Sequence, residues 1–184
     1  METLLDIMAR LRDPESGCPW DRQQNFRSIA PYTLDEAYEV VDAIERDAPA
    51  DLQDELGDLL FQVVFHARMA EEAGWFGFGA VVQGICDKMV RRHPHVFAGE
   101  TITDVEAQTL AWEKHKDRDR AAVIDSAIAG VPLALPALTR ACKLQKKAAR
   151  VGFDWPDIGG VIDKLEEELE ELRTEIDRNA GHAA

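Results

Sequence analysis

Two pairs of acidic residues, each pair spaced three apart, stand out in the first third of the chain. The first pair is Glu36 and Glu39, and the second is Glu55 and Asp58. Residues three apart share one face of an α-helix, so two adjacent antiparallel helices could direct all four carboxylates at one point. Converging anions are unfavourable unless a cation lies between them, and oxygen-only ligands suit a hard cation such as Mg²⁺ or Mn²⁺. The spacing therefore predicts a magnesium site that acts on a phosphate ester or anhydride.

The specificity of this signal lies in the combination of the two pairs. The segment from Asp35 to Asp58 contains ten acidic residues and one basic residue, Arg46, and most acids in such a run are solvated helix surface. Asp42 is a further candidate ligand or water-positioning group. None of the five histidines follows a glutamate by three residues, as ferritin-like di-iron bundles require. No cluster of histidine and cysteine supports a zinc hydrolase.

Apolar spacing and capping residues predict the helices that position these carboxylates. Thr33 is predicted to cap the helix of the first pair, with Glu36 completing a capping box. Asp51 is predicted to cap the helix of the second pair, which extends to about Ala73 with Gly74 as the residue that ends it. The core stripe expected on the first of these helices is Leu34, Ala37, Tyr38, Val41 and Ile44.

The remaining segments are also predicted to be helical or turn-forming. Helices are expected at about residues 2–12, 78–92, 103–120, 136–152 and 158–179, with a non-helical turn at 13–21. The helix around residues 59–65 is apolar nearly all round and should be buried on several sides. No segment shows the sustained alternation of a strand. The predicted fold class is all-α, a helical bundle.

Composition limits the classes of function. With 184 residues, 46% of them hydrophobic, the chain can form one well-packed core. Its net charge of −14 argues against nonspecific binding to duplex nucleic acid or to an anionic membrane. No run of about 18 apolar residues predicts a membrane span. The first residues do not resemble a signal peptide, and three cysteines without a CxxC pair favour a reducing cytoplasm.

Basic and aromatic residues provide candidates for contacts to a nucleotide. Four cations are candidate phosphate ligands: Lys88, Arg91, Arg92 and Lys116. Arginine forks suit phosphate oxygens, although cations at helix C-termini are also common without such a role. Trp20 lies in the predicted turn, where it could stack on a nucleobase or cover the core.

Several separate motifs resemble the MazG nucleoside triphosphate pyrophosphohydrolases. They are the residues 17–21 (GCPWD), 29–34 (IAPYTL), 55–65 (ELGDLLFQVVF) and 91–97 (RRHPHVF), together with the first acidic pair. The resemblance implies the all-α NTP pyrophosphatase fold, with Glu36, Glu39, Glu55 and Asp58 as catalytic Mg²⁺ ligands. The family motif usually begins with two glutamates, whereas this chain has Asp35 before Glu36.

The same resemblance implies how the chain is organised. Residues 1–120 correspond to a catalytic domain with a complete ExxE and ExxD site, residues 121–135 to a linker, and residues 136–184 to a partial second repeat. That repeat has EExxE at Glu167–Glu171 but no ExxD. Family members pair their subunits, so we expect a homodimer or a dimer of dimers.

The function implied by the resemblance is Mg²⁺-dependent hydrolysis of nucleoside triphosphates to a monophosphate and pyrophosphate. Mn²⁺ is an expected substitute for Mg²⁺, and Glu39 is a candidate proton acceptor from the attacking water. Three alternatives stay open. They are a pyrophosphatase narrowly specific for one (d)NTP, a non-catalytic nucleotide-binding regulatory module, and a structural helical dimerisation module.

Overall fold

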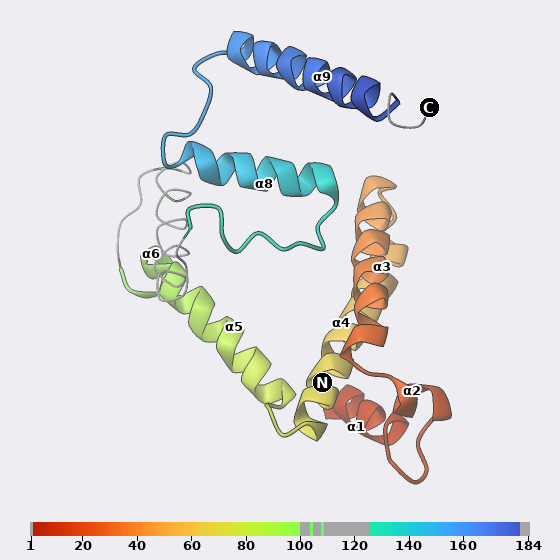
Figure 1. The fold of residues 1–184 in the computed structure, drawn as a ribbon. Helices are drawn as coiled ribbons and strands as arrows, with labels where there is room; N and C mark the ends of the chain where they lie inside the picture. Colours follow the sequence, from red (N-terminus) through yellow and green to blue (C-terminus); the bar gives the residue numbers. More distant parts are fainter. Residues whose placement is uncertain (1, 100–103, 105–107, 109–125, 181–184) are drawn as a thin grey trace. The chain divides into compact units, whose positions relative to one another are not determined.

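The computed structural model describes residues 2–99, 104, 108 and 126–180, and these residues form helices and turns without strands (Figure 1). The all-α prediction is confirmed for this part of the chain. The chain divides into two compact units, Met1–Gln108 and Thr109–Ala184. The predicted helix at about residues 103–120, apart from residues 104 and 108, and residues 121–125 of the predicted linker lie outside the described residues. No helix among the described residues is long and apolar enough to cross a bilayer.

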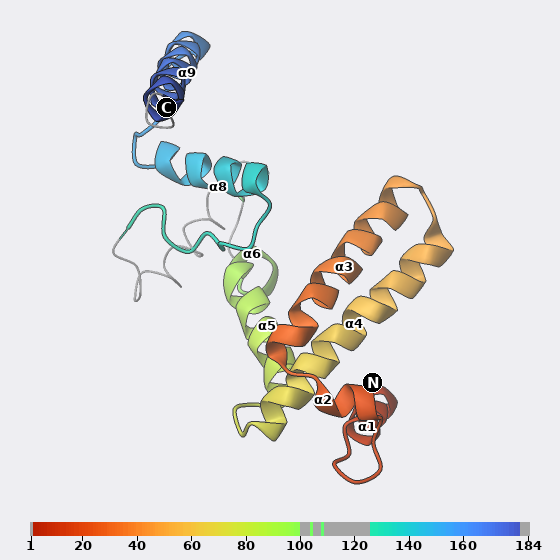
Figure 2. The same cartoon turned by 45° about the vertical axis from the view of Figure 1, so that its right-hand side comes forward.

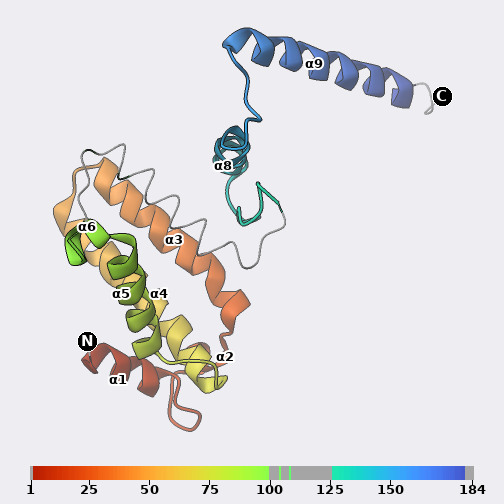
Figure 3. The same cartoon turned by 90° about the vertical axis from the view of Figure 1, so that its left-hand side faces the viewer.

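The first unit is built around a long antiparallel hairpin of two helices. These are α3 (Phe26–Glu45) and α4 (Pro49–Glu72), which lie side by side and are joined by a short turn (Figure 2). The helix α1 (Glu2–Leu11) packs on α4 near the C-terminal end of that helix (Figure 3). The short α2 (Pro19–Gln23) connects α1 to α3, and α5 (Phe78–Arg92) and α6 (Pro94–Phe97) follow α4.

The hydrophobic core lies at one end of the hairpin. Phe65, Val64 and Met69 of α4 are buried there against Met8 of α1 and Ile29 of α3. Phe78 of α5 also packs against this cluster. The prediction that the apolar middle of α4 would be buried on several sides is only partly correct. Val64 and Phe65 are buried and residues 59–61 are half-buried, whereas Val63 is exposed.

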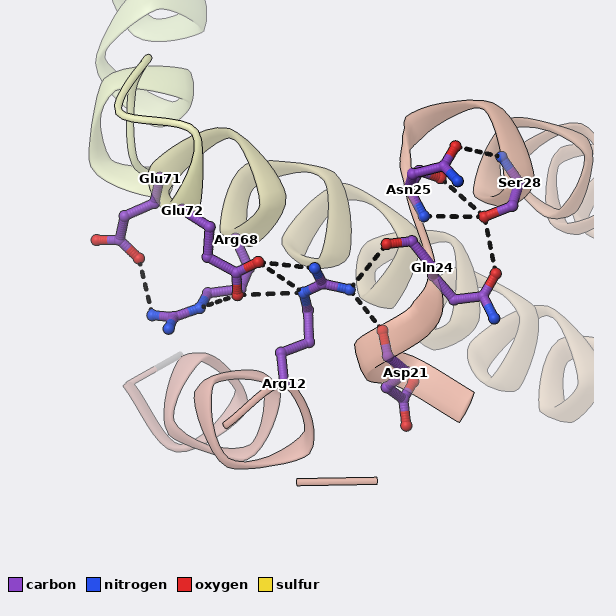
Figure 4. A network of polar contacts seen from close by, with 8 residues as sticks. All are labelled: Arg12, Asp21, Gln24, Asn25, Ser28, Arg68, Glu71 and Glu72. Carbon is purple, nitrogen blue, oxygen red and sulfur yellow. Dashed lines mark hydrogen bonds and ion pairs between the residues drawn. The ribbon is translucent and has the colours of Figure 1, made fainter. Parts of the chain in front are cut away.

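The start of α3 differs from the prediction. Thr33 does not cap a helix, because α3 begins seven residues earlier, at Phe26, with Pro31 inside it. Asn25 is the N-cap, and its side chain accepts from the backbone N–H of Ser28 at 3.2 Å while the Ser28 hydroxyl accepts from that of Asn25 at 2.9 Å. This reciprocal capping box satisfies donors of the first turn of α3 (Figure 4). The predicted turn at 13–21 is also partly wrong, since α2 begins at Pro19.

The end of α4 follows the predicted pattern. Gly74 has a φ of 71°, a left-handed conformation that glycine adopts without strain. The backbone N–H of Gly74 donates to the carbonyl of Glu71, and the N–H of Trp75 donates to the carbonyl of Ala70. This is the hydrogen-bond pattern of a Schellman motif. Trp75 then stacks on Phe26 with ring centroids 5.1 Å apart, so the motif ties the end of α4 to the start of α3.

The predicted core stripe of α3 is not buried within the chain. Leu34, Tyr38 and Ile44 are 52%, 57% and 54% exposed, and Ala37 and Val41 are exposed as well. The face that packs on α4 is instead the next one around the helix, with Ile29 and Ala43 buried and Thr33, Glu36 and Val40 half-buried. The two stripes differ by one residue in register, about 100° around the helix. Periodicity finds both and does not show which one packs inside the chain.

The second unit contains two described helices, α8 (Ala137–Ala149) and α9 (Ile158–Ala180). Both agree with the predicted segments to within a few residues. In α9 the acidic pair of the partial repeat, Glu168 and Glu171, is exposed. Lys164 forms ion pairs with Glu167 and Glu168 at 2.7 and 3.2 Å, so part of this acidic run is compensated along its own helix.

Candidate metal centre

Three of the four predicted carboxylates meet between α3 and α4. One carboxylate oxygen from each of Glu36, Glu39 and Glu55 lies within 4.8 Å of the other two. Glu36 and Glu39 are one turn apart on α3, and the antiparallel arrangement of the hairpin brings Glu55 of α4 opposite them. We call these three residues the carboxylate cluster. Among the described residues, the carboxylate cluster is the group whose side chains are close enough together to hold a metal ion.

Asp58 lies outside this cluster but close enough to act on it electrostatically. The pKa of Glu36 is raised, first by burial of the carboxyl group and then by the charges of Asp58 and Glu39. The pKa of Glu55 is also raised, by loss of solvent and then by Glu39, Asp58 and other nearby acids. Both shifts mean that the folded protein disfavours the fully charged cluster when no cation is present.

The chemistry of this cluster fits a hard divalent cation. Its donors are all carboxylate oxygens, which are the ligands that Mg²⁺ and Mn²⁺ prefer. Burial and, after it, repulsion among the acids raise the pKa of Glu36 and Glu55, and a positive ion placed among them would remove the repulsion. Asp42, the further candidate, instead pairs with Arg46 at 2.7 Å, and Arg46 also pairs with Asp51 at 2.8 Å.

Two polar contacts that the sequence did not predict join α3 and α4 beside this cluster. Nε2 of Gln62 donates to Oε1 of Glu36 at 3.3 Å. One turn further along α4, Nε2 of His66 is hydrogen-bonded to the hydroxyl of Thr33 at 2.9 Å. Burial lowers the pKa of His66, and Phe26 stacks on its ring. Thr33 is therefore a cross-link between the two helices rather than a cap.

A sequence signal for these contacts did exist. Gln62 follows Asp58 by four residues and Glu55 by seven, so it lies on the same face of α4 as the second acidic pair. A polar residue on that face within an otherwise apolar stretch was a candidate for contact with the acids of α3.

The three described candidates for phosphate binding lie on α5, away from the helices α3 and α4 that carry the carboxylate cluster. Lys88 and Arg91 are exposed and Arg92 is half-buried, all near the end of α5. This end of α5 diverges from the α3–α4 turn (Figures 1 and 2). The charges that most affect the pKa of Glu36 and Glu55 all come from acids. Lys116 lies outside the described residues.

Trp20 lies on the short helix α2 and is half exposed. Its ring meets that of Tyr32 edge to face, with the centroids 5.9 Å apart and an interplanar angle of 78°. The accessible part of the ring remains free to contact a ligand or another protein surface. Its role in base binding stays a prediction.

Comparison with known proteins identifies the family. A model of the MazG nucleotide pyrophosphohydrolase domain matches residues 24–97, which include the whole α3–α4 hairpin. The nucleoside triphosphate pyrophosphohydrolase of Escherichia coli K12 is 53% identical over 176 residues, or 95% of this chain and 67% of that protein. The chain belongs to the MazG family. The resemblance inferred from the motifs is thus confirmed.

Other MazG relatives agree with this assignment. The nucleoside triphosphate pyrophosphohydrolase/pyrophosphatase MazG of Thermotoga maritima is 42% identical over 94% of this chain and 66% of its own length. The chain thus spans about two thirds of the length of these curated relatives. A crystal structure of a MazG-related protein from Thermotoga maritima aligns with a TM-score of 0.53 and 27% identity, covering 64% of this chain and 99% of the other. The predicted enzyme class agrees with the names of these relatives.

Proposed function

We propose that this chain hydrolyses nucleoside triphosphates between the α and β phosphates, releasing a monophosphate and pyrophosphate. The observation that carries the proposal is the carboxylate cluster, which lies inside the segment matched by the MazG domain. The relatives named nucleoside triphosphate pyrophosphohydrolase support the same reaction. Cleavage between the α and β phosphates is the reaction that gives pyrophosphate as a product.

The burial of each carboxylate suggests its role. Glu36 and Glu55 are half-buried and would hold Mg²⁺, or Mn²⁺ in its place, with Asp58 near enough to join them after a side-chain rotation. Glu39 is exposed, so it can both contact a cation and accept a proton from the attacking water. A divalent cation in such a site supplies charge neutralisation for the phosphate oxygens and activation of water.

Contacts to the nucleotide are also part of the proposal. Lys88, Arg91, Arg92 and Lys116 would neutralise the outer phosphates, and Trp20 would stack on the base. Because α5 diverges from the α3–α4 hairpin within one chain, its cations would serve this site after a rearrangement or from a second subunit (Figure 1). Residues 1–120 would form the catalytic domain, followed by a linker at 121–135 and a partial second repeat at 136–184. A cytoplasmic location is in keeping with the three free cysteines.

We further propose that the exposed stripe of α3 is the subunit interface of a homodimer, on its own or within a dimer of dimers. Leu34, Tyr38, Val41 and Ile44 lie on one face of a helix that already packs its neighbouring face on α4. Large apolar side chains that are contiguous along a helix and about half exposed are typical of an interface. Pairing through this stripe would place two carboxylate clusters near a common helical bundle.

Dimerisation through this stripe makes a direct prediction for the mass in solution. Light scattering of the wild-type protein should give an even multiple of the 20.6 kDa chain. The double substitution Tyr38→Glu and Val41→Glu should shift the protein toward the monomer, because charges cannot be buried in an apolar interface without a partner. The substitution Asp35→Lys, exposed on the same helix outside the stripe, also changes the net charge by two units and is the matched control. A monomeric wild type at high concentration would refute the dimer.

A panel of all common NTPs and dNTPs with Mg²⁺, followed by chromatography of the products, tests the reaction itself. We expect equal amounts of monophosphate and pyrophosphate, and no products when the metal is removed with EDTA. Turnover of only one (d)NTP would identify a narrowly specific pyrophosphatase. Binding of nucleotide without any product would favour the regulatory module and count against the enzyme.

A further inference from the structure

Gln62 lies where the helices that carry the carboxylates meet. The residue is 7% exposed, and its Nε2 donates to Oε1 of Glu36 at 3.3 Å. The carbonyl oxygen of the same amide, Oε1, is buried and has no hydrogen-bond partner among the described residues. A glutamine with one satisfied and one orphaned group, next to a candidate metal ligand, needs an explanation.

Electrostatics determines which way this amide points. An ionised carboxylate only accepts hydrogen bonds, so it attracts the N–H₂ group of Gln62 and repels the carbonyl oxygen. The orientation that serves Glu36 therefore leaves the Gln62 oxygen unsatisfied inside the protein. Burying a polar atom without a partner costs stability, so a residue chosen for stability alone would be apolar at this position.

We propose that Gln62 is a positioning residue that holds one oxygen of Glu36 and so directs this carboxylate at a cation shared with Glu39 and Glu55. The proposal rests on the proposed function, because it assumes that the carboxylate cluster binds a divalent cation. Each carboxylate has two oxygens, so the one that Gln62 does not hold remains available to the metal. Without the amide, Glu36 could rotate away from the two neighbouring anions.

The fold near Gln62 does not depend on this contact for its register. One turn away, Thr33 and His66 join the same two helices. Beyond them, the buried cluster of Phe65, Val64 and Ile29 fixes the relative position of α3 and α4. An apolar residue of similar length at position 62 is therefore expected to preserve the hairpin while removing the orphaned oxygen.

The experiment compares metal affinity with stability. Gln62→Met and Gln62→Leu remove the amide, and Gln53→Met, exposed on the same helix, is the matched control. Mn²⁺ alone, without nucleotide, is titrated into each protein while the free ion is followed by electron paramagnetic resonance. Thermal unfolding is measured separately in EDTA. We expect Mn²⁺ to bind about 10-fold or more weakly to both Gln62 variants, the size typical for a residue that orients a metal ligand.

The two readouts should change in different directions. The metal-free Gln62 variants should unfold at the wild-type temperature or above it, and the Gln53 control should match the wild type in both measurements. Wild-type affinity in both Gln62 variants would overturn the positioning role, as would a fall in affinity accompanied by a clear loss of stability. A wild-type chain that does not bind Mn²⁺ would overturn the metal site itself, and this inference with it.

Discussion

Replacing Glu39 with glutamine is expected to reduce the Mg²⁺-dependent release of pyrophosphate by at least about 100-fold, the size typical when one preorganised charged or polar group is removed from an active site. Glutamine has nearly the same shape but is a neutral, weaker metal ligand and cannot accept the proton of the attacking water. Glu39 is exposed and lies between two other carboxylates, so its loss removes repulsion and no core contact. Pyrophosphate is measured by chromatography, and the helical content by circular dichroism should be unchanged.

The partial second repeat offers a matched control. Glu171 occupies the last position of an ExxE pair, like Glu39, but lies on α9, where no described acidic group completes a cluster. Glu171→Gln should retain wild-type turnover. Full activity of Glu39→Gln, or an equal loss in both variants, would show that the carboxylate cluster is not the reaction centre.

Replacing Arg12 with alanine is expected to cause the largest loss of stability, about 3 kcal/mol in the free energy of unfolding. The Arg12 side chain is only 9% exposed and donates to both carboxylate oxygens of Glu72, with Nη2 2.7 Å from Oε2 (Figure 4). It also donates to the backbone carbonyls of Asp21 and Gln24 and lies over the ring of Phe65. One guanidinium thus joins α1, α4 and the connection into α3. Urea denaturation followed by circular dichroism measures the loss.

The pH dependence of this effect can be given a sign. Burial alone would raise the pKa of Glu72, but hydrogen bonds and charge from Arg12 and Arg68 outweigh it and hold the pKa below the ordinary value of 4.5. A carboxyl group with a lowered pKa stabilises the fold above its unfolded pKa and loses this contribution as the pH falls through its folded pKa. The difference in the free energy of unfolding between wild type and Arg12→Ala should therefore be largest at pH 7 and should decrease as the pH falls into the acid range.

Two variants separate the specific contacts of Arg12 from its charge. Arg10→Ala removes an exposed cation from the same helix and should change the free energy of unfolding little. Arg12→Lys keeps the charge but not the guanidinium that reaches two carbonyls and a carboxylate. We therefore expect a loss in the free energy of unfolding between those of Arg10→Ala and Arg12→Ala. A stability of Arg12→Ala equal to that of Arg10→Ala would contradict the role given to this residue.

The sequence predicted the carboxylate cluster because helical spacing and like-charge repulsion are local properties. Glu36, Glu39 and Glu55 meet as the i, i+3 rule and an antiparallel hairpin require. Asp58 lies outside the tight group, and spacing alone could not show this, since it depends on side-chain rotation when no cation draws the acids together. The bounds of α5, α8 and α9 also followed from proline positions and apolar periodicity.

The errors in the prediction of α3 have a common physical cause. Thr33 and Glu36 have the residue types of a capping box, but Asn25 and Ser28 form the one that begins α3, and the helix contains Pro31. The core stripe was misassigned because α3 has two adjacent apolar faces, and only tertiary packing selects the one that contacts α4. Gln62 shares a face of α4 with Glu55 and Asp58, but periodicity within one helix does not show which residue of α3 lies opposite it.

The most direct test of the account is a crystal structure of the protein with Mn²⁺, using the anomalous scattering of the metal to locate it. We expect a peak bounded by the carboxylates of Glu36, Glu39 and Glu55, with Asp58 rotated toward it and Gln62 still hydrogen-bonded to Glu36. A metal bound elsewhere, or these carboxylates turned apart toward solvent with no peak between them, would contradict it.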